Sequence, residues 1–259
     1  MRSEHHDTEA KLRPAAAPIF IRTFDTVAAF RDGQQLAFES RNTGARQLMR
    51  QLAFNLLHVD QPVRRSDLIA AAGRHKTYRK RPGAVVSGYC AMLRGWGMGE
   101  ALMTSQYFVL LRRHPCWHTD GDLLLGALKA ARQLERDGDA RAALRELEGA
   151  IELGQGIFLG ELEGDEPFDQ IDGEIAFWAA FQREALQRYA RLCLDIDDPL
   201  YYDRALFAAH RALALRGENT AADNCLAARA ARKAGNEPLA AFYEQRARRR
   251  TPDGRGCQG

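Results

Sequence analysis

The spacing of apolar residues changes near Gly121, and this change limits the folds open to the chain. Before it, segments rich in β-branched and aromatic residues stand among segments with helical spacing. After it, alanine and leucine recur almost everywhere at intervals of three and four, which indicates helices. We therefore predict an α+β region followed by an all-α region, mostly α overall. A length of 259 residues fits two domains of ordinary size.

The charges divide along the same line. Residues 41–118 hold 13 Lys/Arg and 3 Asp/Glu, a net of +10, whereas residues 119–225 hold 11 and 22, a net of −11. Such an asymmetry predicts two domains with different partners, the first partner being a polyanion. The predicted division is a disordered tail over 1–18, a first domain over 19–118, a second over 119–250 and a disordered tail over 251–259.

The first domain combines strands with three helices. Strand formers and a hairpin turn at Asp32-Gly33 predict short strands over 19–40, and a second hairpin follows a Gly-Trp-Gly break and ends near Asp120. We expect the first helix to be capped by Asn42 or Thr43 and the second by Ser66. The predicted helices span 42–58, 66–72 and 82–94. This order, with positive charge on the helices, is that of a winged helix-turn-helix.

The second domain carries a weak internal repeat. Ala143-Leu144 stands seven residues before Ala150, as Ala205-Leu206 stands before Ala212, and Gly235-Asn236 repeats the pattern of Gly138-Asp139. Two of the copies lie ~35 residues apart, close to the tetratricopeptide period. Such repeats stack helix pairs and leave a concave surface for protein contacts. An Ala/Leu-rich bundle with chance matches is the alternative.

Several stretches resemble one family of regulators. RQLMRQLAFNLLHVDQPVRRSDLIAAA, VVSGYCAMLRGWG and QYFVLL resemble the OmpR-type winged helix of the Streptomyces antibiotic regulatory proteins. DGDARAALRELEGAIELGQGIFLGEL, FWAAFQREALQRYARL, RALFAAHRALAL and AGNEPLAAFYEQ resemble their bacterial transcriptional activator domain. The resemblance covers roughly residues 19–249. It implies binding to double-stranded DNA, sometimes as a pair of copies, and activation of transcription through RNA polymerase.

The resemblance makes residues 82–94 the recognition helix. With Val85, Val86, Tyr89 and Leu93 in the core, its outward face is Ala84, Ser87, Gly88, Ala91 and Arg94. The family presents longer polar side chains here, so sequence-specific readout is in question while phosphate binding is not. The basic loop 74–81 could hold phosphates or touch RNA polymerase, or could be a solvated loop. The candidate DNA-binding residues are Arg64, Arg65, Tyr78, Arg79, Lys80, Arg81, Ser87, Ala91, Arg94, Thr104, Ser105 and Gln106.

Other chemistry finds little support in the residues. The five scattered cysteines indicate neither a disulfide framework nor a zinc site, and the acidic stretch 160–174 lacks EF-hand spacing and is expected to be a solvated loop. The HPCWH cluster at 114–118 is expected to be a packed strand end. Without a phosphate-loop, nucleophile-elbow or dinucleotide motif, we expect a non-enzyme with no cofactor or metal. The tail 1–18 lacks an apolar signal region, and we expect a cytoplasmic protein with no membrane association.

Two functions from different classes therefore stay open. The first is a DNA-binding transcriptional regulator, an activator in which the winged helix holds promoter DNA and the helical repeats meet RNA polymerase or other proteins. The second is an interaction scaffold that binds a protein in its repeat groove, with a winged helix that no longer reads DNA. The small side chains on the recognition helix favour the second, and the charge division favours the first.

Overall fold

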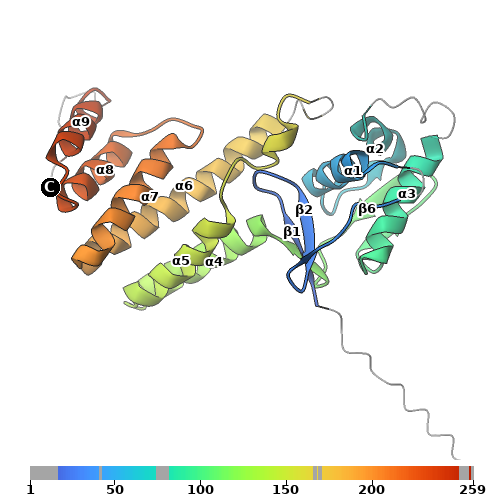
Figure 1. The fold of residues 1–259 in the computed structure, drawn as a ribbon, viewed down its shortest axis with the longest axis horizontal. Coiled ribbons are helices and arrows are strands. Elements are labelled where there is room, and N and C mark those ends of the chain that lie inside the picture. The colour runs from blue at the N-terminus through green and yellow to red at the C-terminus, as the bar shows by residue number, and fades with distance from the viewer. Residues whose placement is uncertain are drawn as a thin grey trace, which may run out of the picture.

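The computed structural model describes residues 17–40, 43–73, 82–165, 168, 171–250 and 257. Its N-terminal part holds two small sheets and three helices, and its C-terminal part is a row of helices (Figure 1). The predicted α+β region followed by an all-α region is therefore confirmed. In the described part of the chain, no helix is long and apolar enough to cross a membrane.

The first sheet has the order β3-β2-β1-β7. β1 and β2 run antiparallel, and β2 turns into β3 at Asp32 and Gly33, whose positive φ angles of 52° and 75° confirm the predicted hairpin turn. β7 pairs with β1 in parallel, so the end of the first domain returns to its beginning. The strands are β1 (Ile19–Arg22), β2 (Ala28–Arg31), β3 (Gln34–Gln35) and β7 (Trp117–Thr119).

The second sheet lies among three helices, in the arrangement of a winged helix. Its order is β4-β6-β5, so the hairpin of β5 and β6 forms the wing, and β4 joins the first two helices. The helices are α1 (Ala45–Leu57), α2 (Arg65–Ala71) and α3 (Pro82–Gly95), and the strands are β4 (Val63–Arg64), β5 (Leu102–Thr104) and β6 (Phe108–Leu111). All three helices match the predicted ones to within three residues at each end.

The predicted helix caps were wrong. Gly44 precedes α1 without a side-chain cap, and Thr43, one candidate, has a buried hydroxyl without a hydrogen-bond partner; Asn42 lies outside the described residues. Arg64 precedes α2, and Ser66 lies inside the helix, where its hydroxyl bonds Asp67. In α2 the preceding strand β4 and the bond from Arg65 N–H to the Tyr107 carbonyl fix the start, so a side-chain cap is not required.

The second part consists of helices in consecutive antiparallel pairs, which form a row in Figure 1. They are α4 (Asp120–Arg136), α5 (Ala140–Leu153), α6 (Ile171–Ile196), α7 (Tyr202–Ala214), α8 (Ala221–Lys233) and α9 (Glu237–Arg248). The repeat of Gly138-Asp139 at Gly235-Asn236 has a structural basis. Both glycines take positive φ, and the residues that follow them, Asp139 and Asn236, cap α5 and α9. Thr119 and Thr220 form capping boxes at α4 and α8.

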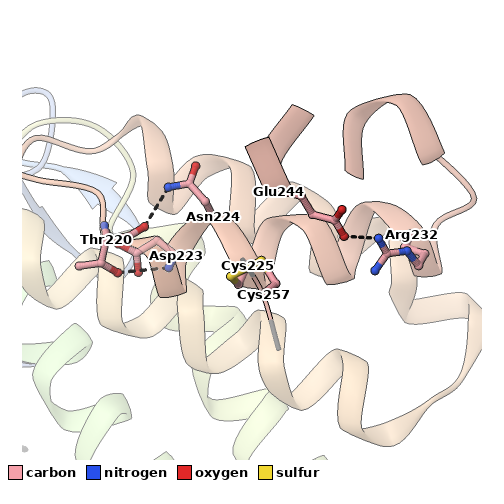
Figure 2. The surroundings of a disulfide bond; sticks show 7 residues. All are labelled: Thr220, Asp223, Asn224, Cys225, Arg232, Glu244 and Cys257. Atoms are coloured by element: carbon pink, nitrogen blue, oxygen red, sulfur yellow. Dashed lines mark hydrogen bonds and ion pairs between the residues drawn. A yellow bond between two sulfur atoms is a disulfide. The ribbon is translucent and has the colours of Figure 1, made fainter. Parts of the chain in front are cut away.

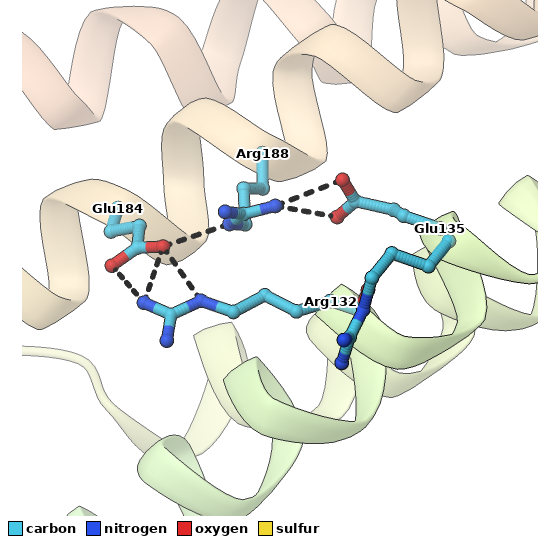
Figure 3. Close-up of polar contacts among 5 residues, drawn as sticks. Arg132, Glu135, Glu184 and Arg188 are labelled. Atoms are coloured by element: carbon cyan, nitrogen blue, oxygen red, sulfur yellow. Dashed lines mark hydrogen bonds and ion pairs between the residues drawn. The ribbon is translucent and has the colours of Figure 1, made fainter.

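A network of ion pairs joins α4 to α6 (Figure 3). Arg132 contacts Glu184 at 2.6 Å, Arg188 contacts the same carboxylate at 2.8 Å, and Arg188 also contacts Glu135 at 2.8 Å. Burial tends to raise the pKa of Glu184, but the hydrogen bonds from both arginines outweigh it and hold that pKa below its usual value. The network therefore fastens the first and second helix pairs to each other.

In its described part, the acidic stretch 160–174 is held by specific contacts, which a solvated loop would not have. Glu161 accepts a bond from the Val27 N–H at 2.6 Å, Asp165 pairs with Arg50 of α1, and Glu163 pairs with Arg216 after α7. Its carboxylates thus connect the helical row to the N-terminal part. The prediction failed because each basic or N–H partner lies 50 or more residues away in the sequence.

One aspartate fixes the junction between the two parts. The carboxylate of Asp120, the first residue of α4, accepts bonds from the Thr23 N–H at 2.8 Å, the Phe24 N–H at 3.0 Å, the Gly121 N–H at 3.0 Å and the Thr23 hydroxyl. The loop at 156–160 closes over the same turn, because Leu159 N–H donates to the Thr23 carbonyl at 2.7 Å. A single hydrophobic core consequently runs from Ile19 to Tyr243, across the boundary predicted at 118/119.

Candidate nucleic-acid interface

The recognition helix predicted at 82–94 is α3. Its inner face holds Val85, Val86, Tyr89 and Leu93, all buried as predicted. Asn55 of α1 donates to the Tyr89 hydroxyl at 2.9 Å, and burial raises the pKa of Tyr89 above its usual value. This buried hydrogen bond fixes the rotation of α3 about its axis, so the opposite face points away from α1.

The outward face of α3 is more covered than its sequence suggested. Ser87, Ala91 and Arg94 are exposed, but Ala84 and Gly88 are half-buried. A segment before α1 lies against the helix here, and a Cβ atom on Gly88 would overlap the Ser40 hydroxyl and come within 3.0 Å of the Thr43 Oγ1. The glycine that weakens the helix in isolation is therefore the residue that allows the chain to pass over it.

The wing and the two helices before it are connected by side-chain hydrogen bonds. Arg94 at the end of α3 donates to the Thr104 hydroxyl at 3.3 Å, and Arg65 at the start of α2 donates to the Ser105 carbonyl at 3.0 Å. Gln106 is exposed in the turn between β5 and β6. Of the predicted set, the structure thus brings together Arg65, Arg94, Thr104, Ser105 and Gln106.

Arg64 and Ser87 are exposed on β4 and α3, and Ser87 bonds the Gly83 carbonyl of its own helix at 3.0 Å. Ala91 is exposed but offers a methyl group alone. The remaining four predicted residues, Tyr78, Arg79, Lys80 and Arg81, lie outside the described residues. The basic loop therefore stays a prediction.

Sequence reasoning missed two residues of this surface. Arg112 follows β6, is exposed, and lies at the base of the wing with its guanidinium 3.6 Å from the Met103 sulfur. Tyr107 in the wing turn is 73% exposed. The register of the hairpin could have found Arg112, because its N–H pairs with the Ala101 carbonyl and continues the wing by one residue. The exposure of Tyr107 had no sequence signal, since an aromatic residue in a strand pattern is usually packed.

The positive charges of this surface are uncompensated. Within the described ranges, no carboxylate lies within ion-pair distance of Arg64, Arg65, Arg94 or Arg112. Six arginines of the helical row, by contrast, each contact an acidic side chain: Arg132, Arg188, Arg204, Arg216, Arg229 and Arg232. Pairing does not follow the charge division strictly, because Arg46, Arg50 and Arg113 of the N-terminal part also contact carboxylates, and no described carboxylate pairs with Arg141, Arg145 or Arg191 of the helical row.

A hollow of about 570 Å³ lies between α3 and the segment before α1. Its floor is formed by small residues of α3, and Trp96 anchors its wall by donating from its indole N–H to the Ala37 carbonyl at 3.3 Å. Glu39 stands on that wall and is exposed. The lining residues are Ala37, Glu39, Ser40, Ala84, Ser87, Gly88, Ala91, Met92, Gly95 and Trp96.

Neither a metal cluster nor a continuous acidic site accompanies this surface. Over the ranges that the structure describes, no three His, Cys, Asp or Glu side chains are grouped to hold a metal ion. In the HPCWH cluster, Trp117 and His118 belong to β7, with Trp117 buried and its indole N–H donating to the Arg112 carbonyl at 3.0 Å. The predicted packed strand end is confirmed.

Comparisons with known proteins give a limited result. No protein-family model matches the sequence, and no curated protein matches it. Among solved structures, the chain is similar to Mycobacterium tuberculosis EmbR in complex with a low-affinity phosphopeptide, with 16% identity and a TM-score of 0.49, over 92% of this chain and 73% of that chain. A likeness of this degree assigns no function, so the proposal below rests on the geometry and charges of the chain itself.

Proposed function

We propose that this chain binds double-stranded DNA with its winged helix and regulates transcription, while its row of helices contacts protein partners. Activation through RNA polymerase is the finer part of the proposal. α3 would lie in the major groove, the β5–β6 wing beside it, and the start of α2 against the phosphates.

The observation that carries the proposal is the set of unpaired arginines around α3. Arg64, Arg65, Arg94 and Arg112 come from three places in the sequence and lie on α2, α3 and the wing sheet. Arg65, Arg94 and Arg112 contact a carbonyl, a hydroxyl and a sulfur atom, and no described carboxylate pairs with any of the four arginines. Cations in this state gain more from phosphate than cations already in ion pairs, because no existing pair has to be broken.

The test is a fluorescence-anisotropy titration of the full chain with a random-sequence duplex at three salt concentrations. The variant replaces Arg64, Arg94 and Arg112 by alanine. If each contacts one phosphate, the slope of log K against log salt should fall by nearly three, at ~0.9 per phosphate contact. Arg65 is left in place because its bond to the Ser105 carbonyl also supports the wing.

The matched control replaces Arg141, Arg145 and Arg191, three exposed arginines of α5 and α6. The control changes the net charge by the same amount and should leave the slope unchanged. An equal loss in both triple variants would mean that binding follows net charge alone, and the interface proposed here would be wrong. Absence of binding by the unmodified chain at the lowest salt would refute the function itself.

The hollow on α3 favours a second candidate, a winged helix that docks a protein. Its lining is mostly apolar, and Glu39 places a negative charge beside the recognition helix, where DNA phosphate would be repelled. Replacing Glu39 by glutamine discriminates between the two. Glu39→Gln should strengthen DNA binding and weaken the binding of a basic protein segment, whereas Ala91→Glu should remove both kinds of binding.

A further inference from the structure

We propose that Cys225 and Cys257 form a reversible redox clamp, which holds α9 inside a closed loop as a disulfide and releases it as two thiols. This pair contradicts the expectation that the cysteines form no disulfide. No pattern of residues indicates this pairing, because the two cysteines are 32 positions apart and belong to no spaced motif.

The bond joins the second turn of α8 to the chain beyond α9 (Figure 2). Its Cα atoms are 5.2 Å apart, and the whole of α9 lies inside the loop that it closes. Arg250 makes a second connection, because its guanidinium donates to the Asn219 carbonyl just before α8. Arg250 and Cys257 are therefore both attached to the first half of α8 or the residues just before it.

The last helix pair is where such a fastening has most effect. α9 has twelve residues, of which Ala240, Tyr243 and Ala247 are buried. In the described part of the chain it is the last helix of the row, and the terminal units of a helical row are the first to open. Arg232 of α8 adds ion pairs to two residues of α9, Glu244 (Figure 2) and, at 3.8 Å, Glu237. Because few side chains of α9 are buried, the disulfide is needed to keep α9 packed against α8.

The remaining thiols are poor competitors for this chemistry. Cys90 and Cys193 are buried, and burial raises the pKa of both, that of Cys193 to about 11. Burial also raises the pKa of Cys116. Since the thiolate is the reactive form, these three exchange slowly at neutral pH. Cys225 and Cys257 are both partly exposed, so a reductant or oxidant can reach them.

The exchange needs a dithiol, and its electrons balance. A thiolate of the dithiol attacks one cysteine sulfur, breaks the S–S bond and forms a mixed disulfide, while the other cysteine leaves as a thiolate. The second thiol of the reagent then closes its own disulfide and expels the first cysteine. The protein has gained two electrons and two protons, and the dithiol has lost them. A small-molecule disulfide reverses the reaction.

The experiment uses the full chain, oxidised with glutathione disulfide and compared with the same protein in dithiothreitol. Hydrogen exchange followed by mass spectrometry reports on α8–α9 and, as an internal reference, on α4–α5. Reduction should accelerate amide exchange in α9 by up to about five-hundredfold, the loop-closure effect of a crosslink of this span, while α4–α5 stays unchanged.

Two variants complete the test. Cys225→Ser/Cys257→Ser should show the fast exchange in both conditions, and Cys116→Ser should keep the full response of the unmodified chain. Alkylation of Cys225 and Cys257 in the oxidised sample would show that no disulfide forms and would overturn the proposal. Equal exchange of α9 in oxidised and reduced protein would overturn it as well, because the bond would then exist without clamping the helix.

Discussion

Replacing Asp120 by asparagine should weaken the attachment of the helical row to the N-terminal sheet. Asp120 is fully buried and its two carboxylate oxygens accept four bonds, two each. The asparagine oxygen can replace the carboxylate oxygen that accepts from the Thr23 and Phe24 N–H groups, and the amide nitrogen can then donate to the Thr23 hydroxyl. That nitrogen also faces the Gly121 N–H, which is a donor. One buried donor without a partner costs ~1–3 kcal/mol, and removal of a buried charge offsets part of this, so we expect a loss of about 1–2 kcal/mol.

Urea unfolding of the full chain, followed by circular dichroism, measures this loss. The matched control is Asp139→Asn, which makes the same chemical change at the exposed cap of α5. Asparagine caps a helix as well as aspartate does, so the control should differ from the unmodified chain by less than ~0.5 kcal/mol. If Asp120→Asn were no more destabilising than Asp139→Asn, the role of Asp120 at the junction would be refuted.

The pH dependence of the free energy of unfolding provides a second test of the role of Asp120. Burial raises the pKa of Asp120 above its usual value, against the opposing effect of its four hydrogen bonds. Between the unfolded and the folded pKa, the folded state holds a proton that the unfolded state has lost, so stability falls as pH rises through this interval. Asparagine does not titrate. The stability of the unmodified chain relative to Asp120→Asn should therefore decrease as pH rises above the ordinary aspartate range, and an increase would contradict the assignment.

Two further changes test the junction loop and the ion-pair network. Gly156→Ala should destabilise the chain by at least ~2 kcal/mol, because Gly156 has a φ of +94° and a Cβ would lie 2.7 Å from the Asp25 Cβ; Gly164→Ala, at φ +78° with nothing within 4 Å, should lose ~1 kcal/mol. If Gly156→Ala and Gly164→Ala unfolded at the same urea concentration, the predicted clash between residue 156 and Asp25 would be refuted. A double-mutant cycle on Arg132→Ala and Glu184→Gln should give a coupling of ~0.5–1 kcal/mol that declines with salt, and a coupling independent of salt would contradict an ionic origin.

The sequence was sufficient for elements whose signal is local. The amphipathic spacing of α1 and α3, the Asp32-Gly33 turn and the glycine before each of α5 and α9 all act within one or two helical turns. The two helices and the turn were predicted correctly, and the two glycines were noted as part of a repeat. Helix caps were not predicted correctly, because the start of α2 is set by its pairing with the wing, and the Tyr107 carbonyl that fixes it lies about forty residues away.

The parts that escaped prediction depend on contacts between distant segments. The Ser40 hydroxyl lies on Gly88, Glu161 accepts from the Val27 N–H, and Cys257 bonds Cys225. Nothing in the residues adjacent to either partner identifies the other. The same limit applies to the candidate site. Its arginines could be proposed from their charge, but whether a carboxylate neutralises them is a property of the folded chain.

The free energy with which α3 can discriminate between base pairs shows whether one winged helix alone could select particular promoters. On the outward face of α3, within its described side chains, Arg94 is the one residue able to make a bidentate base contact. Such a contact discriminates by ~1–3 kcal/mol, about 5- to 150-fold, whereas specific regulators exceed their non-specific binding by roughly 10³ or more. When a second copy binds an adjacent site, the discrimination factors of the two copies multiply. A partner held by α4–α9 adds its own base contacts. On these magnitudes, we infer that a single winged helix of this chain holds DNA through phosphate and that selectivity arises in an assembly. Selection of enriched sites from a random duplex library would yield paired half-sites if this is correct, and a single long half-site would refute it.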